Sequence, residues 1–386
     1  METKLKIGQF SDSFLPIVDG VGRVVFNYCN TLGNMGQEVV AVCPMENMGY
    51  RGEYPFEIID YYSTTVPTTT YNAGIPLTDI HFMKRLDMND FDIIHVHTPF
   101  IAGLEGLRRA RKKKVPVVGS FHSKYYDDFL QMTGSKHLAG LGTDVIVKFY
   151  EACDEVWTVS ENSAETLKSY GYTKPIYVVP NGMDIKEIDY SLAIKAKKHF
   201  NLGFDPVLLY VGQINWKKNI ERIIEACSLL KKDGIKFQLV LAGKGPHEGE
   251  IKQRVKELGI EDITFFTGHV SDEDLLYGLY ALADLFVFPS NYDTYSMVVR
   301  EAANARTASV VLKNSAPAEC IVDKENGLLC EDTSESLYEV IKDAMKDENY
   351  LINLGIKAKE TIPISWDVVM TQVLERYHYL IKNGIK

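Results

Sequence analysis

Short apolar runs alternate with helical patterns along most of the chain, and this alternation constrains the fold more than any other feature. In the first half the apolar runs lie at residues 5–10, 38–43, 56–59, 92–97, 115–121, 155–159 and 176–179. Strands separated by helices form parallel sheets that are covered on both faces. We therefore expect a doubly wound α/β sheet that binds ligands at the carboxyl ends of its strands.

The alternation starts again after a polar helical pattern at 192–200 and a turn that ends at Pro206. The second set of apolar runs lies at residues 207–212, 237–242, 263–266, 285–288 and 310–312. A chain of 386 residues is longer than one typical domain. We expect two Rossmann-like domains, at 1–190 and 191–365, followed by an amphipathic helix at 366–386.

Composition excludes some classes of function. Binding to a nucleic-acid backbone needs clustered positive charge, and the net charge here is −10. The six cysteines form no Cys-x-x-Cys pair, so we expect reduced thiols in a cytoplasmic protein. The sequence opens on a strand pattern and not on an apolar signal region, and no apolar run approaches the roughly 18 residues that span a bilayer.

The segment at 285–301 combines an apolar strand, a polar turn and a helix that begins near Met297. A helix start stabilises an anion through its unpaired N–H groups and its dipole. Asp293 precedes this helix and Glu301 lies within it, about 12 Å further along. Two carboxylates at this spacing can hold hydroxyls at both ends of a nucleotide-diphosphate sugar. The alternative is an acidic helix cap and an exposed Glu with no ligand.

Two other segments also resemble anion sites. Gly20 and Gly22 follow the first strand and precede a helical pattern, which favours close approach of a phosphate, although a flexible loop explains them as well. Lys217 and Lys218 precede a helix at 219–234, where an amine can neutralise a departing diphosphate. The alternative for these lysines is an ordinary solvated surface.

Gly243 and Gly245 follow a strand and precede a helix, a spacing that resembles the dinucleotide fingerprint of an NAD(P)-dependent oxidoreductase. In that class the fingerprint follows the first strand of its unit, whereas here it follows the second. His95 and His97 lie on one face of a strand and His122 ends another. Because no third ligand is evident for a metal, we expect hydrogen-bonding or catalytic histidines and no metal site.

Several of these segments resemble the family-4 retaining glycosyltransferases of the GT-B fold, also called glycosyl transferases group 1, and among them the diacylglycerol glucosyltransferases. The 286–301 segment is similar to the family's Glu-x7-Glu motif, with Asp293 in place of the first Glu. Residues 211–219 are similar to its Gly-Arg-Leu-x-x-x-Lys segment, with Gln213 in place of Arg and Lys218 as the Lys. Residues 20–22, 92–99, 115–122 and 243–246 match further family segments.

The resemblance implies transfer of a hexose, most simply glucose, from a UDP-sugar to a hydroxyl with retention, without a metal or other cofactor. It implies that the last helix packs back toward the N-terminal domain. The residues that it assigns to catalysis are His122, Lys218 and Asp293. Those that it assigns to donor binding are Gly20, Gly22, Gln213, Gly243, Gly245, Thr294, Tyr295, Ser296, Met297 and Glu301.

A further alternative is a metal-dependent glycosyltransferase with an Asp-x-Asp site. Two such pairs occur, at 90–92 and 272–274. Ser271 and Asp274 have the spacing of a helix-capping box, and Asp92 opens a strand, so both pairs also have a structural explanation.

The acceptor side is the least defined part of the sequence. The candidates are His97, Tyr125 and Tyr126, which either line an acceptor site or pack in the core. A basic run nearby suggests contact with an anionic membrane surface, or else a solvated helix end; it consists of Arg108, Arg109, Arg111, Lys112, Lys113 and Lys114. We expect a membrane lipid such as diacylglycerol as the acceptor, ahead of a soluble saccharide or a cell-envelope glycan precursor. Such an enzyme would act at the inner face of the plasma membrane.

Overall fold

The computed structural model describes residues 4–14, 20–44, 53–65 and 72–384. The chain divides into two compact units, one of residues 1–182 with 366–386 and one of residues 183–365. The sequence led us to expect the division at 190. The difference arises because α7 (Tyr190–His199) packs on α10 (Glu273–Leu282), so the segment before α7 belongs with the second unit.

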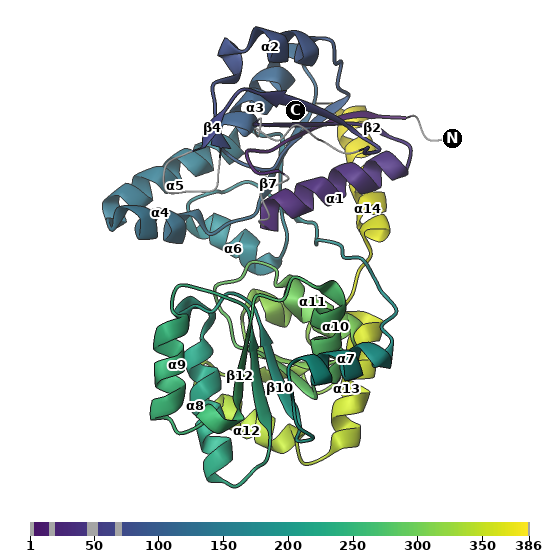
Figure 1. Ribbon diagram of the computed structural model, residues 1–386. Helices are drawn as coiled ribbons and strands as arrows, with labels where there is room; N and C mark the ends of the chain where they lie inside the picture. The colour runs from purple at the N-terminus through teal and green to yellow at the C-terminus, as the bar shows by residue number, and fades with distance from the viewer. Residues whose placement is uncertain (1–3, 15–19, 45–52, 66–71, 385–386) are drawn as a thin grey trace. The chain divides into compact units, whose positions relative to one another are not determined.

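The first unit is built on a parallel sheet of seven strands in the order β3-β2-β1-β6-β7-β8-β9. Its strands are β1 (Lys6–Phe10), β2 (Glu38–Pro44), β3 (Glu57–Tyr61), β6 (Ile93–Val96), β7 (Val117–Phe121), β8 (Glu155–Thr158) and β9 (Ile176–Val178). Two of these strands, β2 and β7, are labelled in Figure 1. A short antiparallel pair, β4 (Thr64–Thr65) and β5 (Asn72–Ala73), lies outside this sheet.

Helices connect successive strands of this sheet, as expected for a doubly wound fold. They are α1 (Gly20–Asn34), α2 (Ile80–Asp87), α3 (Ile101–Lys113), α4 (Tyr125–Thr133), α5 (Lys136–Glu151) and α6 (Glu161–Ser169). The C-terminal helix α14 (Trp366–Asn383) packs against α1 and completes the unit. A Cβ atom at Gly182 would lie 2.6 Å from the Cα atom of Trp366, so a larger residue would push α14 away.

The second unit repeats the architecture with a parallel sheet of six strands in the order β12-β11-β10-β13-β14-β15. Its strands are β10 (Val207–Val211), β11 (Gln238–Ala242), β12 (Thr264–Gly268), β13 (Leu285–Phe288), β14 (Ser309–Leu312) and β15 (Leu328–Cys330). Its helices besides α7 and α10 are α8 (Ile220–Lys232), α9 (Glu248–Glu257), α11 (Met297–Asn304), α12 (Ser334–Ala344) and α13 (Glu348–Thr361). The expected α/β architecture with two parallel sheets is therefore confirmed.

Each unit has its own hydrophobic core, which is built around the buried central strands of its sheet. All four residues of β6 and all four of β13 are buried. In each unit the chain adds strands to one side of the sheet and then switches to the other side. The switch lies between β1 and β6 in the first unit and between β10 and β13 in the second. Ligands of open α/β sheets bind beside the carboxyl ends of strands at such a switch. The loops after these strands are therefore the places to look for a site.

Candidate active site

In the second unit, the loop after β13 brings together two residues that lie far apart in the sequence. Lys218 Nζ donates a hydrogen bond of 2.8 Å to Asp293 Oδ1, and Ser290 Oγ lies 2.5 Å from Asp293 Oδ2. The side chains of Lys218 and Asp293 are 16 % and 20 % exposed. A ligand can therefore reach the pair, while partial burial strengthens the attraction between the two charges. Ser290 was not among the predicted site residues.

The turn between β13 and α11 has an unusual backbone. Ser296, the residue before α11, has a φ of 57°, in the left-handed region that favours glycine, and its side chain does not cap the helix. Arg300 Nη1 donates a 2.6 Å hydrogen bond to the Tyr295 carbonyl oxygen, and the guanidinium lies 3.5 Å from the centroid of the Tyr295 ring. Arg300 lies in α11, which begins at Met297. It thus holds the preceding turn from inside the unit.

Glu301 is oriented by a side chain from α10. Tyr280 OH donates a 2.8 Å hydrogen bond to Glu301 Oε2. Burial raises the pKa of Tyr280 well above its usual value and the neighbouring Glu301 raises it further, so the phenol remains a donor at neutral pH. Tyr280 was not predicted as a site residue. Its contribution is to fix the direction of the carboxylate.

The Gly-x-Gly segment has a packing explanation. A Cβ atom at Gly243 would lie 1.8 Å from the Gly212 carbonyl oxygen, and one at Gly245 would lie 2.1 Å from the Ile214 carbonyl oxygen. Glycine is therefore required where the loop after β11 crosses the loop after β10. Gln213, in the latter loop, is exposed, and its backbone oxygen accepts a 2.9 Å hydrogen bond from Tyr210 OH.

Gly20 and Gly22 lie within α1, whereas the sequence led us to expect them before a helix. Residues 15–19, which precede them, lie outside the described residues.

The histidines of the first unit form a buried hydrogen-bonded chain. His97 Nδ1 lies 3.2 Å from His122 Nε2, and His97 Nε2 lies 2.7 Å from Gln9 Oε1. His95 Nδ1 lies 2.5 Å from Tyr377 OH on α14, and His95 Nε2 lies 2.7 Å from Ser120 Oγ. Burial lowers the pKa of both His95 and His97 well below the usual value, so both rings are neutral at neutral pH.

No cluster of three or more His, Cys, Asp or Glu side chains suited to a metal ion occurs among the described residues. Both Asp-x-Asp pairs have structural partners. Asp92 accepts from the Lys6 N–H, and Asp90 pairs with Lys113. Asp272 caps α10, and Asp274 pairs with Lys195.

The acceptor-side candidates have different surroundings. Tyr125 is buried against Phe121, Phe100 and Phe129, so it packs in the core. Tyr126 is partly exposed, and its backbone N–H donates to Tyr170 OH.

The basic run is largely neutralised by carboxylates, which corrects its interpretation as a patch of six available cations. Arg109 is 2 % exposed and pairs with Glu105 and Asp87. Arg108 also pairs with Glu105, Lys112 with Asp87, and Lys113 with Asp90. Arg111 and Lys114 are exposed, and neither has a carboxylate partner among the described residues.

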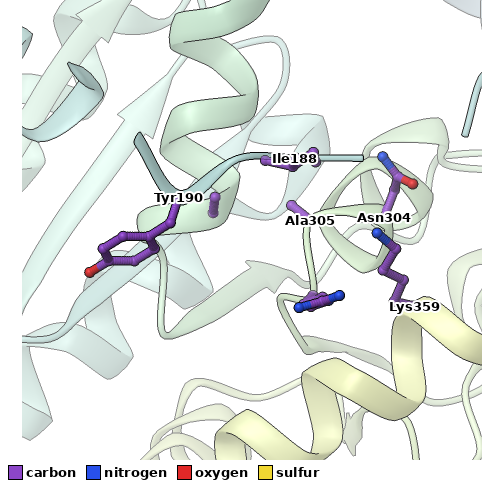
Figure 2. A pocket seen from close by; sticks show the side chains of 7 residues that line it. Ile188, Tyr190, Asn304, Ala305 and Lys359 are labelled. Atoms are coloured by element: carbon purple, nitrogen blue, oxygen red, sulfur yellow. The ribbon is translucent and has the colours of Figure 1, made fainter. Parts of the chain in front are cut away.

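A separate cavity of about 210 Å³ lies in the second unit and is lined by Ile188, Tyr190, Ala281, Asn304, Ala305, Arg306 and Lys359 (Figure 2). None of the predicted site residues lines it. The six cysteines are free, and all but Cys320 are buried. Within the described residues, no helix is long and apolar enough to cross a membrane.

Comparisons with known proteins place both units in one group. Residues 18–187 match the model "Glycosyltransferase Family 4", and residues 194–361 match "Glycosyl transferases group 1". The chain is 26 % identical to an alpha-monoglucosyldiacylglycerol synthase of Streptococcus pneumoniae, over 84 % of this chain and 75 % of the relative. It is 25 % identical to a GDP-mannose-dependent alpha-mannosyltransferase of Corynebacterium glutamicum, over 97 % of this chain and 88 % of the relative.

Solved structures show the same fold. HepE of Anabaena in complex with UDP and glucose aligns with a TM-score of 0.75 at 16 % identity, covering 97 % of this chain and all of that one. Sucrose-phosphate synthase of Thermosynechococcus elongatus aligns with a TM-score of 0.79 at 18 % identity, covering 98 % of this chain and all of that one. With the two family models, these likenesses show that the chain belongs to the family-4 glycosyltransferases of the GT-B fold and is a nucleotide-sugar-dependent hexosyltransferase.

Proposed function

We propose that the protein transfers glucose from UDP-glucose to a hydroxyl with retention of the anomeric configuration. The observation that carries this proposal is the Lys218–Asp293 pair beside the start of α11, with Glu301 held by Tyr280 on the same helix. This unit presents a cation for a diphosphate, a carboxylate for the sugar hydroxyls and a second carboxylate for the ribose. A nucleotide sugar needs all three groups.

Donor binding exchanges one partner of Lys218 for another. In the structure Asp293 accepts from Lys218, so the two charges balance each other. A bound diphosphate competes for the ammonium and turns Asp293 toward the sugar hydroxyls. As the glycosidic bond breaks, negative charge grows on the diphosphate, where Lys218 and the N-terminus of α11 stabilise it. These groups supply the charge that a metal would otherwise supply.

Retention follows in this proposal from attack on the same face that the diphosphate leaves. The acceptor hydroxyl loses its proton to the departing phosphate oxygen, its oxygen bonds to the anomeric carbon, and the bond between that carbon and the phosphate oxygen breaks. The products are the α-glucoside and protonated UDP. His122 is the residue of the first unit that we propose to act in the transfer. The departing phosphate oxygen takes both the electron pair of the broken bond and the proton of the acceptor hydroxyl, so no added base is needed.

An early-time NMR spectrum of the product tests this proposal. UDP-glucose, GDP-mannose and NADH are supplied in separate reactions with a lipid and saccharide acceptor mixture, with and without EDTA. We expect UDP release and an α-anomer from UDP-glucose that EDTA does not reduce. A β-anomer contradicts retention, strict dependence on Mg²⁺ contradicts the metal-free mechanism, and exclusive use of GDP-mannose contradicts the choice of donor.

For the acceptor, we propose the hydroxyl of a membrane lipid such as diacylglycerol at an anionic cytoplasmic leaflet. A diacylglycerol-derived product is named for the S. pneumoniae relative. On α5, Leu138, Leu141 and Val145 are each at least half exposed and share one helix face by their spacing. Met132 on α4 is also exposed. An apolar helix face of this kind binds at the headgroup boundary, and exposed Lys136 and Lys148 flank it.

A further inference from the structure

The cavity shown in Figure 2 is lined by charges of one sign. Its walls come from α7, α10, α11 and α13 and from the segments that flank α7 and α11, all within the second unit. Of the seven residues that the structure places in these walls, Arg306 and Lys359 are cationic and none is acidic. A concave site with two cations in its walls attracts an anion.

Arg306 is held in the cavity wall by its backbone. Its N–H donates a 2.9 Å hydrogen bond to the Ala303 carbonyl oxygen at the end of α11. On the other side, a Cβ atom at Gly355 of α13 would lie 2.0 Å from the Arg306 carbonyl oxygen. The φ of Arg306 is 62°, in the left-handed region that favours glycine, and strain of this kind is common at ligand sites. The side chain is exposed and has no carboxylate partner among the described residues.

Lys359 of α13 is the second cation. Its side chain is 17 % exposed, and its Nζ lies 3.1 Å from Glu187 Oε2. Because the Glu187 side chain is 86 % exposed, water and salt screen this pair, and it contributes little to stability. Asp189, the other carboxylate next to Ile188 in the sequence, caps α7 by accepting from the Ser191 N–H. An anion in the cavity can therefore take the Lys359 ammonium from Glu187.

Asn304 is an independent indication of a ligand. It lies in the cavity wall and is fully buried, and neither its Nδ2 nor its Oδ1 has a hydrogen-bond partner within the described part of the chain. A buried amide without partners costs stability, and such groups are rare in folded proteins. Figure 2 shows Asn304 and Lys359 on the same side of the cavity and Tyr190 on the other. The Asn304 amide can donate to an anion through Nδ2 and accept from a hydroxyl through Oδ1.

We propose that this cavity binds a small soluble phosphomonoester that carries at least one hydroxyl group. A phosphomonoester has close to two negative charges at neutral pH, which match the two cations, whereas a carboxylate has only one. The planar guanidinium of Arg306 binds two of the phosphate oxygens, and the Lys359 ammonium binds the third. Ile188, Ala281 and Ala305 give the carbon atoms an apolar wall. The volume of about 210 Å³ is several times the roughly 30 Å³ that one water molecule occupies, so a three-carbon ester fits.

Calorimetric titration of glycerol 3-phosphate into the full-length protein tests the proposal. In one arm the protein is first saturated with UDP, and in a second it carries Lys218→Met, so that phosphate binding at the proposed donor site does not contribute. We expect saturable binding in both arms, tighter than that of inorganic phosphate, and no binding of glycerol. No saturable binding of glycerol 3-phosphate overturns the proposal. Inorganic phosphate that binds as tightly as the ester overturns the assignment of a hydroxyl-bearing ligand.

The variant Arg306→Gly separates ligand binding from folding. Glycine adopts a φ of 62° without strain, so we expect this variant to be at least as stable as the wild type. It should bind glycerol 3-phosphate about 10- to 100-fold more weakly, the range for loss of hydrogen bonds to a charged group. The matched control is Lys324→Gly, which removes a cation at a φ of 66° elsewhere in the same unit and should leave binding unchanged. Wild-type affinity in Arg306→Gly, or an equal loss in the control, overturns the proposal.

The variant Asn304→Leu tests the amide. It replaces two buried polar atoms that lack partners with an apolar group of similar size, so the ligand-free protein should unfold at a higher urea concentration. Binding of glycerol 3-phosphate should weaken, because one donor and one acceptor are lost. Binding as tight as in the wild type would contradict the role of Asn304 and with it the hydroxyl group of the ligand.

The proposal does not depend on the transfer reaction, because the cavity shares no residue with the proposed donor site. We expect Lys218→Met to weaken only UDP binding and Arg306→Gly to weaken only glycerol 3-phosphate binding. If UDP fails to bind the wild type, the proposed function is wrong and the Lys218→Met arm still tests the cavity. Dihexanoyl phosphatidic acid that binds more tightly than glycerol 3-phosphate would make a lipid headgroup the ligand, which contradicts a soluble ester.

Discussion

At the scale of single residues, the proposed role of the Lys218–Asp293 pair predicts that donor binding depends on one ammonium group. Lys218→Met keeps most of the side-chain volume and removes the charge that we propose to meet the diphosphate. Hydrogen bonds to charged groups contribute about 1.5–3 kcal/mol, so we expect UDP to bind roughly 10- to 100-fold more weakly by calorimetry. Lys217→Met is the matched control, because Asp293 pairs with Lys218. Equal losses in both variants would contradict a specific role for Lys218.

Ser296 offers a test of stability at the same scale. Its φ of 57° disfavours any residue with a Cβ atom, and its buried Oγ has no hydrogen-bond partner in the described structure. Ser296→Gly should therefore raise the free energy of unfolding of the second unit by about 1 kcal/mol. Ser296→Val should lower it, since a β-branched residue fits this backbone poorly. Chemical denaturation followed by Trp216 fluorescence, with Trp157 and Trp366 replaced by Phe, isolates this unit. A loss of stability in Ser296→Gly would contradict the argument.

At the scale of elements, the sequence predicted most strands because each is a buried apolar run in a parallel sheet. It missed β15, which has only three residues, and the β4–β5 pair, in which each strand has two. Such short strands carry too little periodicity to detect.

The local structure of the candidate site was predictable where one continuous segment forms it. The strand and the helix on either side of Asp293 and Glu301 are present as the sequence predicted, and the roles of the two carboxylates stay predictions. Tyr280 was missed because it lies on another helix, and Gln9 and Tyr377 because 368 residues separate them. Contacts of this kind depend on the topology, which a local pattern does not contain.

The exposed face of α5 leads to a prediction about membrane contact. Replacing Leu138, Leu141 and Val145 together by Ser should reduce sedimentation with phosphatidylglycerol vesicles at low salt several-fold, because less apolar surface enters the headgroup boundary. The matched control replaces Ile352 and Ile356 of α13, which are also exposed, by Ser. Unchanged sedimentation of the α5 variant, or no sedimentation of the wild type, would contradict the lipid acceptor but not the transferase assignment.

At the scale of the molecule, the buried histidines tie the stability of the first unit to pH. Burial lowers the pKa of His95 and His97 in the folded state, so below about pH 6.5 the unfolded chain binds protons that the folded chain does not. Their stabilising contribution is present above that pH and is lost as the pH falls. The two histidines together should give a slope of up to about 2.7 kcal/mol per pH unit.

Urea denaturation between pH 7 and pH 5.5 measures this slope. A Trp216→Phe background leaves Trp157 and Trp366, both in the first unit, as reporters. The variant His95→Gln should show a slope about 1.4 kcal/mol per pH unit smaller than its parent. Identical slopes would mean that His95 is protonated in the folded state, which would contradict its place in the buried chain.

The central claim is that a nucleotide sugar binds the second unit through Lys218, Asp293 and Glu301 without a metal ion. Calorimetric titration of UDP-glucose into wild type and Glu301→Gln, both in EDTA, tests it most directly. The amide introduced by this substitution cannot accept two ribose hydroxyls as the carboxylate does, so binding should weaken by roughly tens-fold, while the thermal stability of the protein changes little. Equal affinity for UDP-glucose in the two proteins, or binding to the wild type only after Mg²⁺ is added, would contradict the account.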